Sequence, residues 1–309
     1  MLESWREYPV GKPSDRLGWV EKSCTPFETV SHISHWRQAL CICRDGVIKP
    51  RVICDESRLK GKGITVVWLS PNDWHGGSRY GNVEFDFKLN QVLNRHLNFY
   101  WVETIPYRVP ACRILITSKE YKLEVYNPED GKGPWWFDRP ANKHYRNGYV
   151  TLEFMLEDEL ALDGAAETRF IDHSDAMCCD DLFKCPDRGL SAWKAGAKFL
   201  AAYAGLGLPA KSLKLVDSCG DASNSLQSSW RKLGLKLYPL AEFQGTVTAQ
   251  SAEANKLARV VMKALAEGDD AQCKQNANSF QSAEELVATC ASVIEDTLSL
   301  PKDMLLPDL

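Results

Sequence analysis

The chain changes composition sharply near its middle, and this change limits the folds that it can adopt. Residues 1–160 contain three alanines, whereas residues 161–309 contain 24. Eight of the ten tryptophans lie at or before Trp136. Alanine favours helices, while aromatic and β-branched residues favour the half-buried surface of a sheet. We therefore predict an α+β domain with a mixed sheet over residues 1–170, followed by an α-helical domain over residues 187–309.

Hydrophobic periodicity and turn residues predict the individual elements. Strands are expected over 29–32, 64–69, 82–88, 100–105, 113–117 and 149–155. Helices are expected over 36–44, where Gly46 provides a stop, and over 89–97. The second half predicts helices over 191–204, 222–233, 251–267 and 282–298. Strands mixed with a few helices in the first half are typical of an α+β fold.

Charge and cysteine content narrow the cellular setting. The formal net charge is −4, and no apolar run reaches the ~20 residues that a membrane span needs. The first seven residues contain early acid and no apolar core, so we expect no signal peptide. Eleven cysteines with irregular spacing favour reduced thiols over a disulfide framework. We expect a cytoplasmic protein that has no membrane partner.

Common catalytic motifs are absent from the sequence. It contains no phosphate-binding loop, no H-E-x-x-H zinc motif, no G-x-S-x-G elbow and no dinucleotide-binding G-x-G-x-x-G after a strand. The candidate catalytic and ligand-binding side chains are concentrated between residues 28 and 117.

Three segments in this region carry those side chains. His32 and Ser34 alternate on a predicted strand, so an imidazole and a hydroxyl share one face and can hold a ribose or an amide. Trp68 and Tyr80 flank a turn-rich stretch, where aromatic faces can stack on a nicotinamide or a base. Glu103 interrupts an apolar strand, where a carboxylate lies either at an exposed edge or in a functional pocket. Each segment also fits a structural role.

In this order the segments resemble the ADP-ribosyltransferase superfamily, in which a histidine, an aromatic residue and a glutamate on successive strands surround NAD. The H-x-S strand, helix and D-G-x-I return between His32 and Ile48 are similar to the openings of DarT-type DNA ADP-ribosyltransferases and of RNA 2′-phosphotransferases. Residues 68–70 and 78–85 partly match the strand and G-x-R-x-G turn of the latter group. The resemblance spans residues 28–117 and implies an NAD-dependent transferase.

The resemblance also implies roles for individual residues. His32 would bond the nicotinamide ribose and take part in catalysis, and Ser34 would support it. Trp68 or Tyr80 would stack on the nicotinamide, and Ser70 belongs to the same NAD-binding strand. The catalytic acid would be Glu103, with Glu153 as the second choice. Two further glutamates, Glu84 and Glu124, stay open as alternatives.

A basic segment beside the predicted pocket suggests the acceptor. Its cationic residues are Arg44, Lys49, Arg51, Arg58, Lys60 and Lys62. Such charges bind phosphates, although a solvated loop has the same composition. Relatives in the resembling families modify nucleic acids, and CmdT-type enzymes of phage defence modify mRNA. The resemblance therefore implies a nucleic acid substrate, RNA more than DNA, and a toxin that an antitoxin or chaperone protein restrains.

Two other functions fit the sequence. Asp73, Asp86 and Lys88 follow the D…D-x-K pattern of Mg²⁺-dependent nucleases, which need metal and no NAD. Alternatively, the ADP-ribosyltransferase-like fold is a catalytically inactive binding module.

A set of metal-ligating side chains lies at the domain junction: His173, Cys178, Cys179 and Cys185. Adjacent cysteines without a C-x-x-C pair do not suit a closed tetrahedral site, so we predict buried thiols and no metal.

Overall fold

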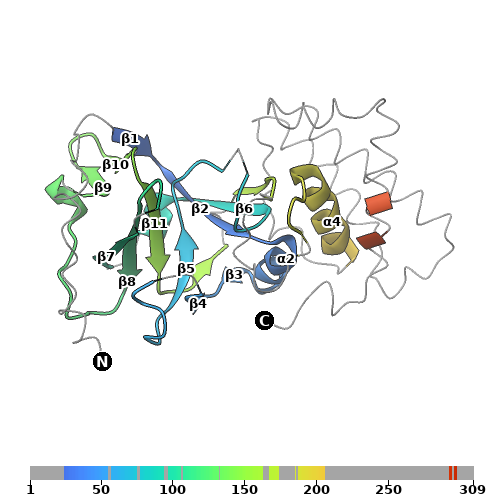
Figure 1. The fold of residues 1–309 in the computed structure, drawn as a ribbon, viewed down its shortest axis with the longest axis horizontal. Coiled ribbons are helices and arrows are strands. Elements are labelled where there is room, and N and C mark those ends of the chain that lie inside the picture. The colour runs from blue at the N-terminus through green and yellow to red at the C-terminus, as the bar shows by residue number, and fades with distance from the viewer. Residues whose placement is uncertain are drawn as a thin grey trace. The chain divides into compact units, whose positions relative to one another are not determined.

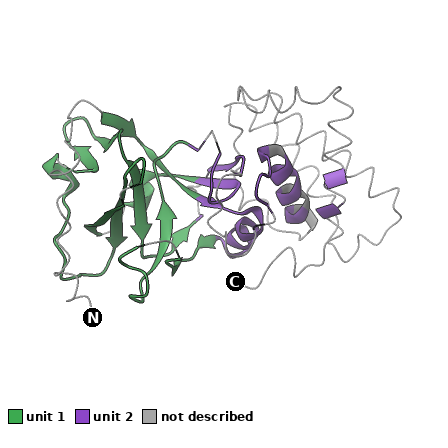
Figure 2. Ribbon diagram, in the orientation of Figure 1, with its two compact units in different colours: residues 1–32, 47–73, 86–161 green, residues 33–46, 74–85, 162–309 purple. Residues whose placement is uncertain are grey.

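The structure is a computed structural model, and it describes residues 24–54, 57–74, 77–93, 97–105, 107–131, 133–162, 167–173, 185, 187–205, 292–293 and 296–297. The chain divides into two compact units (Figure 2). Unit 1 comprises residues 1–32, 47–73 and 86–161, and unit 2 comprises residues 33–46, 74–85 and 162–309. The predicted mixture of strands and a few helices is confirmed.

The described residues form strands and helices in the following order (Figure 1). They are β1 (Cys24–Phe27), β2 (Thr29–Ser34), α2 (Trp36–Asp45), β3 (Val47–Ile48), β4 (Arg51–Val52), β5 (Thr65–Leu69), β6 (Val83–Lys88), α3 (Leu89–Val92), β7 (Asn98–Ile105), β8 (Ala111–Thr117), the 3-10 turn η2 (Pro128–Asp130), β9 (Trp135–Asp138), β10 (Lys143–Asn147), β11 (Thr151–Leu156), β12 (Leu160–Ala161), β13 (Glu167–Phe170) and α4 (Ala192–Gly205).

A five-stranded mixed sheet with the order β4-β5-β11-β8-β7 is the centre of unit 1. Strand β11 pairs with β8 in parallel and with β5 in antiparallel orientation, and Figure 1 shows these three strands side by side. All seven residues of β8 are buried, because the strand has a neighbour on each side and both of its faces are covered. This explains its nearly continuous apolar sequence, which only Arg113 and Thr117 interrupt.

The two faces of this sheet are covered by different parts of unit 1. On one face, the rings of Phe154 and of Trp135 from the smaller β1-β10-β9 sheet make a T-shaped contact, with 5.2 Å between their centroids. On the other face, the loop between β4 and β5 contributes Ile53, Leu59 and Ile64 to a buried cluster. The remaining members of that cluster come from the sheet and are Val66, Tyr100, Val102, Leu115 and Met155. The sheet is therefore the middle layer of unit 1.

Helices α2 and α4 and strand β13 belong to unit 2, and α4 contacts both α2 and β13. Helix α2 buries Trp36 and Leu40 and ends at Gly46, which adopts the left-handed conformation of a helix stop, as the sequence predicted. Helix α4 packs on β13, where Gly196 admits the ring of Phe170 at a distance that leaves little room for a Cβ.

All six predicted strands form, and the predicted helices at 36–44 and 191–204 correspond to α2 and α4. The helix predicted over 89–97 is wrong in length, because α3 ends at Val92. The chain is already extended at Asn98, which pairs with Thr117, so tertiary pairing overrides the local helix preference. The helices predicted at 222–233, 251–267 and 282–298 lie outside the described residues, except for helical pieces at 292–293 and 296–297.

Among the described residues, every helix is too short or too polar to cross a membrane.

Among the described residues of unit 2, the strictest steric constraint lies at Gly81. Its φ is +149°, and a Cβ there would approach the Ser34 carbonyl oxygen to 2.3 Å and the His35 nitrogen to 2.6 Å. Asn82 N donates to the same Ser34 oxygen at 3.1 Å, and this hydrogen bond opposes a shift of the Ser34 backbone away from an added Cβ. We predict that Gly81→Ala lowers the free energy of unfolding by more than about 3 kcal/mol, measured by urea titration.

Gly131→Ala is the matched control for this prediction. Gly131 has φ +65°, but no atom lies within 4 Å of its missing Cβ, so the substitution adds backbone strain without a collision. It should cost only about 1 kcal/mol. Equal losses in the two variants would contradict the steric argument.

Candidate functional site

A hydrogen bond to strand β5 holds the His32 side chain in place. His32 lies on β2, and its Nδ1 is 2.9 Å from the carbonyl oxygen of Trp68 on β5. A carbonyl oxygen only accepts, so Nδ1 carries the proton and Nε2 has the acceptor lone pair. Burial lowers the pKa of His32 to about 4; the bond to Trp68 acts in the opposite direction, and the charge of Arg51 lowers the pKa further. The imidazole is therefore neutral near pH 7.

Trp68 connects this histidine to a buried arginine. Arg113 Cζ lies 4.8 Å from the centroid of the Trp68 ring, which is a cation–π contact. Trp68 lies opposite Met155 in the β5–β11 ladder, so its ring is on the sheet face that also carries Glu153. The backbone of Trp68 thus holds His32, while its side chain holds the guanidinium.

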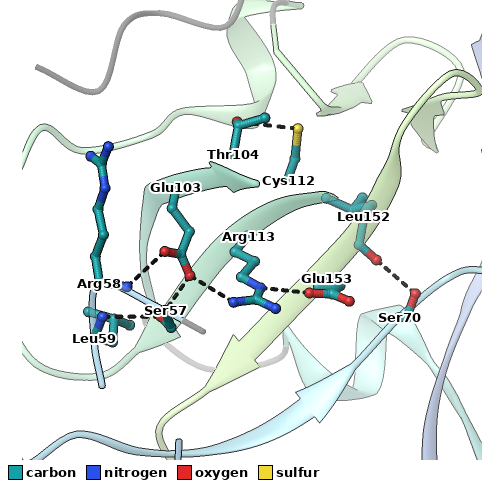
Figure 3. Close-up of polar contacts among 10 residues, drawn as sticks. All are labelled: Ser57, Arg58, Leu59, Ser70, Glu103, Thr104, Cys112, Arg113, Leu152 and Glu153. Carbon is teal, nitrogen blue, oxygen red and sulfur yellow. Dashed lines mark hydrogen bonds and ion pairs between the residues drawn. The ribbon is translucent and has the colours of Figure 1, made fainter. Parts of the chain in front are cut away.

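Arg113 joins two glutamates on the two strands that flank it (Figure 3). Its Nε donates to Glu153 Oε2 at 2.7 Å, and its Nη1 donates to Glu103 Oε1 at 3.1 Å. The side chains of Arg113, Glu103 and Glu153 are 1%, 5% and 10% exposed. Burial alone would lower the pKa of Arg113, but the charges and hydrogen bonds of Glu153 and Glu103 raise it overall. The guanidinium is permanently charged, and the three groups form an ion cluster.

Glu103 also anchors the loop that covers its sheet face. Ser57 Oγ donates to Glu103 Oε1 at 2.7 Å, and the backbone nitrogen of Arg58 donates to Oε2 at 2.9 Å (Figure 3). Both oxygens of this carboxylate therefore accept hydrogen bonds from the chain itself. The predicted catalytic acid fixes the 57–60 turn to β7.

Strand order brings His32 and Glu153 into one neighbourhood. Ser31 and Ser70 form an antiparallel bridge, with Ser31 N donating to Ser70 O at 2.8 Å and Ser70 N donating to Ser31 O at 3.0 Å. Ser70 Oγ then donates to the Leu152 carbonyl at 2.7 Å (Figure 3), so Ser70 connects the strand of His32 to the strand of Glu153. Glu103 lies on β7, at the far edge of the sheet from β5.

The other predicted site residues have different places. Ser34 and Tyr80 belong to unit 2, where the rings of Tyr80 and Trp74 make a T-shaped contact with 5.8 Å between their centroids. Glu84 is also in unit 2, buried with Arg169 Nη1 3.9 Å away. Glu124 is exposed. The structure therefore groups His32, Trp68, Ser70, Glu153 and Glu103 within unit 1.

The residues of the nuclease pattern do not form a ligand set in the part of the chain that the structure describes. Asp86 is buried and accepts from Ser31 Oγ at 3.3 Å, while Asp73 and Lys88 are exposed. The one group of three metal-ligating side chains found among the described residues contains neither aspartate.

The basic segment presents its charges to solvent. In unit 1, every basic side chain between Lys49 and Lys62 is exposed. Lys60 Nζ also donates to the Cys54 carbonyl at 2.7 Å, which closes the loop on itself. The described residues of this loop therefore present a basic surface, and Glu103 bonds the 57–60 turn to the sheet.

Arg113 is the residue that sequence reasoning missed. It lies in β8 (Ala111–Thr117), and the apolar pattern of this strand predicts no charged residue on either face. A single arginine inside an apolar strand is itself a signal, because a buried guanidinium requires carboxylate partners.

No protein-family model, curated protein or solved structure matches this chain.

Removal of Arg113 tests the importance of the ion cluster. Arg113→Met leaves two carboxylates buried without their counter-charge, so we expect the free energy of unfolding to fall by about 3–5 kcal/mol at pH 7. Urea titration followed by tryptophan fluorescence measures this. Arg139→Met is the control, because Arg139 makes an exposed ion pair with Glu129 at 2.7 Å and its loss should change stability little. Similar losses in both variants would contradict a special role for the buried cluster.

The depressed pKa of His32 predicts a pH dependence of stability. Between pH 6.5 and about 4, the unfolded chain binds a proton on His32 that the folded chain does not bind. Its contribution is complete above pH 6.5 and is lost as the pH falls towards 4, by roughly 2 kcal/mol at pH 5. His32→Gln keeps a donor for the Trp68 carbonyl but cannot titrate. The difference in unfolding free energy between the two proteins should therefore change with pH in this window, and a constant difference would contradict the assignment.

Proposed function

We propose that this protein is an NAD-dependent ADP-ribosyltransferase that modifies nucleic acid, RNA more than DNA, with Glu153 as the catalytic acid. The observation that carries the proposal is the grouping of His32, Trp68 and Glu153 within unit 1, linked through the Ser31–Ser70 bridge and the Trp68–Arg113 contact. These are a histidine, an aromatic residue and a glutamate on three different strands, as in the family that the sequence resembles.

The geometry favours Glu153 over Glu103 for the catalytic role. Glu153 lies on β11, which pairs directly with the Trp68 strand, whereas two further strands separate Glu103 from Trp68. Glu103 accepts three hydrogen bonds that anchor a loop and the sheet. A carboxylate with that task is poorly placed to change its contacts during a reaction. We therefore assign Glu103 a positioning role.

The proposed reaction replaces one glycosidic bond by another. The bond between ribose C1′ and the nicotinamide nitrogen breaks, and the nitrogen keeps the electron pair. An oxygen or nitrogen of the acceptor forms the new bond to C1′ and releases its proton to solvent. The C1′ centre is cationic in the transition state, and a nearby carboxylate stabilises this charge.

The charge balance of the ion cluster suits this chemistry. Two carboxylates and one guanidinium leave one net negative charge in a mostly dry environment. Such a charge attracts a pyridinium ring and stabilises a developing cation more strongly than in water. The neutral imidazole of His32 offers Nε2 as an acceptor for a ribose hydroxyl without adding an opposing positive charge.

The basic loop supports a nucleic acid as the acceptor. The exposed cations Arg51, Arg58 and Lys60 lie on the segment that Glu103 anchors in unit 1, and phosphate contacts would position a nucleic acid there. An enzyme that modifies RNA in its own cell is toxic when unrestrained. We therefore also propose that the protein is a phage-defence toxin and that an antitoxin or chaperone protein restrains it.

The experiment is transfer of label from adenylate-labelled NAD to separate pools of RNA, DNA and cell protein. We expect transfer to RNA, and a loss of at least about 100-fold in Glu153→Gln with NAD binding retained. Glu103→Gln should lose much less. Glu129→Gln, at an exposed glutamate, is the matched control and should react like the wild type.

Three results would overturn parts of this proposal. Wild-type rates in Glu153→Gln would remove Glu153 from catalysis, and a selective loss in Glu103→Gln would return the role to Glu103. Label on DNA or protein alone would replace RNA as acceptor. Absence of any transfer, with Mg²⁺-dependent strand cleavage that Asp86→Asn abolishes, would support the nuclease instead.

A further inference from the structure

Three metal-ligating side chains meet in unit 2. They are His35, His173 and Cys185, and their ligand atoms all lie within 4.8 Å of one another. His35 and His173 are 7% and 2% exposed, and Cys185 is partly buried. The sequence grouped His173 and Cys185 with Cys178 and Cys179 and predicted no metal; Cys178 and Cys179 lie outside the described residues, and His35 was not part of that group.

We propose that His35, His173 and Cys185 bind a zinc ion. Two of the three distances match such an ion, and the third, from Cys185 Sγ to His35 Nε2, is shorter. A tetrahedral zinc with Zn–N of about 2.05 Å and Zn–S of about 2.3 Å requires about 3.3 Å between two nitrogens and about 3.6 Å between nitrogen and sulfur. The separation of the two Nε2 atoms is 3.2 Å, and Cys185 Sγ lies 3.2 Å from His35 Nε2 and 3.6 Å from His173 Nε2.

The tautomer of His173 supports the same conclusion. Its Nδ1 lies 2.9 Å from the Ser78 carbonyl oxygen, which only accepts, so Nδ1 carries the proton. The Nε2 lone pair therefore points to the other two ligand atoms. Metal-ligating histidines characteristically donate their second nitrogen to a carbonyl or carboxylate in this way.

Backbone hydrogen bonds hold His173 in place, in addition to the hydrogen bond of its ring. Ser78 and His173 form a parallel bridge, and His173 N donates to Leu190 O at 2.8 Å while Gly189 N donates to His173 O at 3.1 Å. His35 immediately precedes α2, and Cys185 belongs to the segment that leads to α4. A zinc ion here would join three segments of unit 2 that are distant in sequence.

The ligand chemistry favours zinc over the hard cations Mg²⁺ and Ca²⁺. Two imidazoles and one thiolate are borderline-soft donors, which Mg²⁺ and Ca²⁺ disfavour and zinc prefers. Binding releases the thiol proton of Cys185 and stabilises the folded state, because the unfolded chain does not hold the three ligands together. This proposal is independent of the transferase proposal, since it involves none of the same residues.

The test uses the full chain without an affinity tag. Metal analysis of the purified wild type should give about one zinc per chain, and a chelator should remove it. Cobalt added to the metal-free protein should produce the thiolate charge-transfer band and the intense d–d bands of a tetrahedral site, and zinc should abolish both. Zinc should also raise the Tm of the metal-free wild type.

Variants separate this site from incidental binding. Cys185→Ser should lose the zinc, the charge-transfer band and the Tm shift, and His173→Gln should lose the zinc. Cys54→Ser removes an exposed thiol of unit 1 and should keep all three signals. A wild type that binds neither metal, or a Cys185→Ser variant with the wild-type cobalt spectrum, would overturn the proposal. The cobalt spectrum needs no enzymatic activity, so its outcome does not depend on NAD.

Discussion

A guanidinium buried in the middle of a sheet constrains the neighbouring strands of unit 1. Arg113 is 1% exposed on a strand that is covered on both faces. An unpaired charge in such a place would cost several kcal/mol, so the carboxylates beside it stabilise the sheet. Glu153 and Glu103 meet this requirement from the two neighbouring strands. The register of three strands is thereby fixed by charge as well as by apolar alternation.

The same cluster links stability to the proposed chemistry. One carboxylate anchors the basic loop, the other lies beside the aromatic strand, and the guanidinium between them contacts the Trp68 ring. A change that repacks this cluster with apolar side chains would remove both the charge that suits a cationic transition state and the anchor of the loop. Proteins commonly keep such costly polar groups where function requires them.

Local patterns in the sequence predicted much of the framework, whereas the grouping of the candidate site residues depends on long-range strand pairing. The alternation of Val83–Lys88 and the apolar run Thr65–Leu69 identify strands without further information. Strands β9 and β10 were missed because aromatic and charged residues mix in them. The choice between Glu103 and Glu153 depends on which strand pairs with β5, and no local pattern contains that information. His35 lies 138 residues from His173, which is why the sequence did not group them.

The parallel pairing of β8 with β11 has a consequence for how the chain is made. Arg113 leaves the ribosome 40 residues before Glu153, and β5 leaves it about 85 residues before its partner Phe154. Domains complete their folding when their last long-range partner is available, and such pairings are slow to form. The central sheet is therefore incomplete until β11 has emerged. A nascent chain would lack the assembled ion cluster until that point, so the proposed activity would arise only after unit 1 has been synthesised almost to its end.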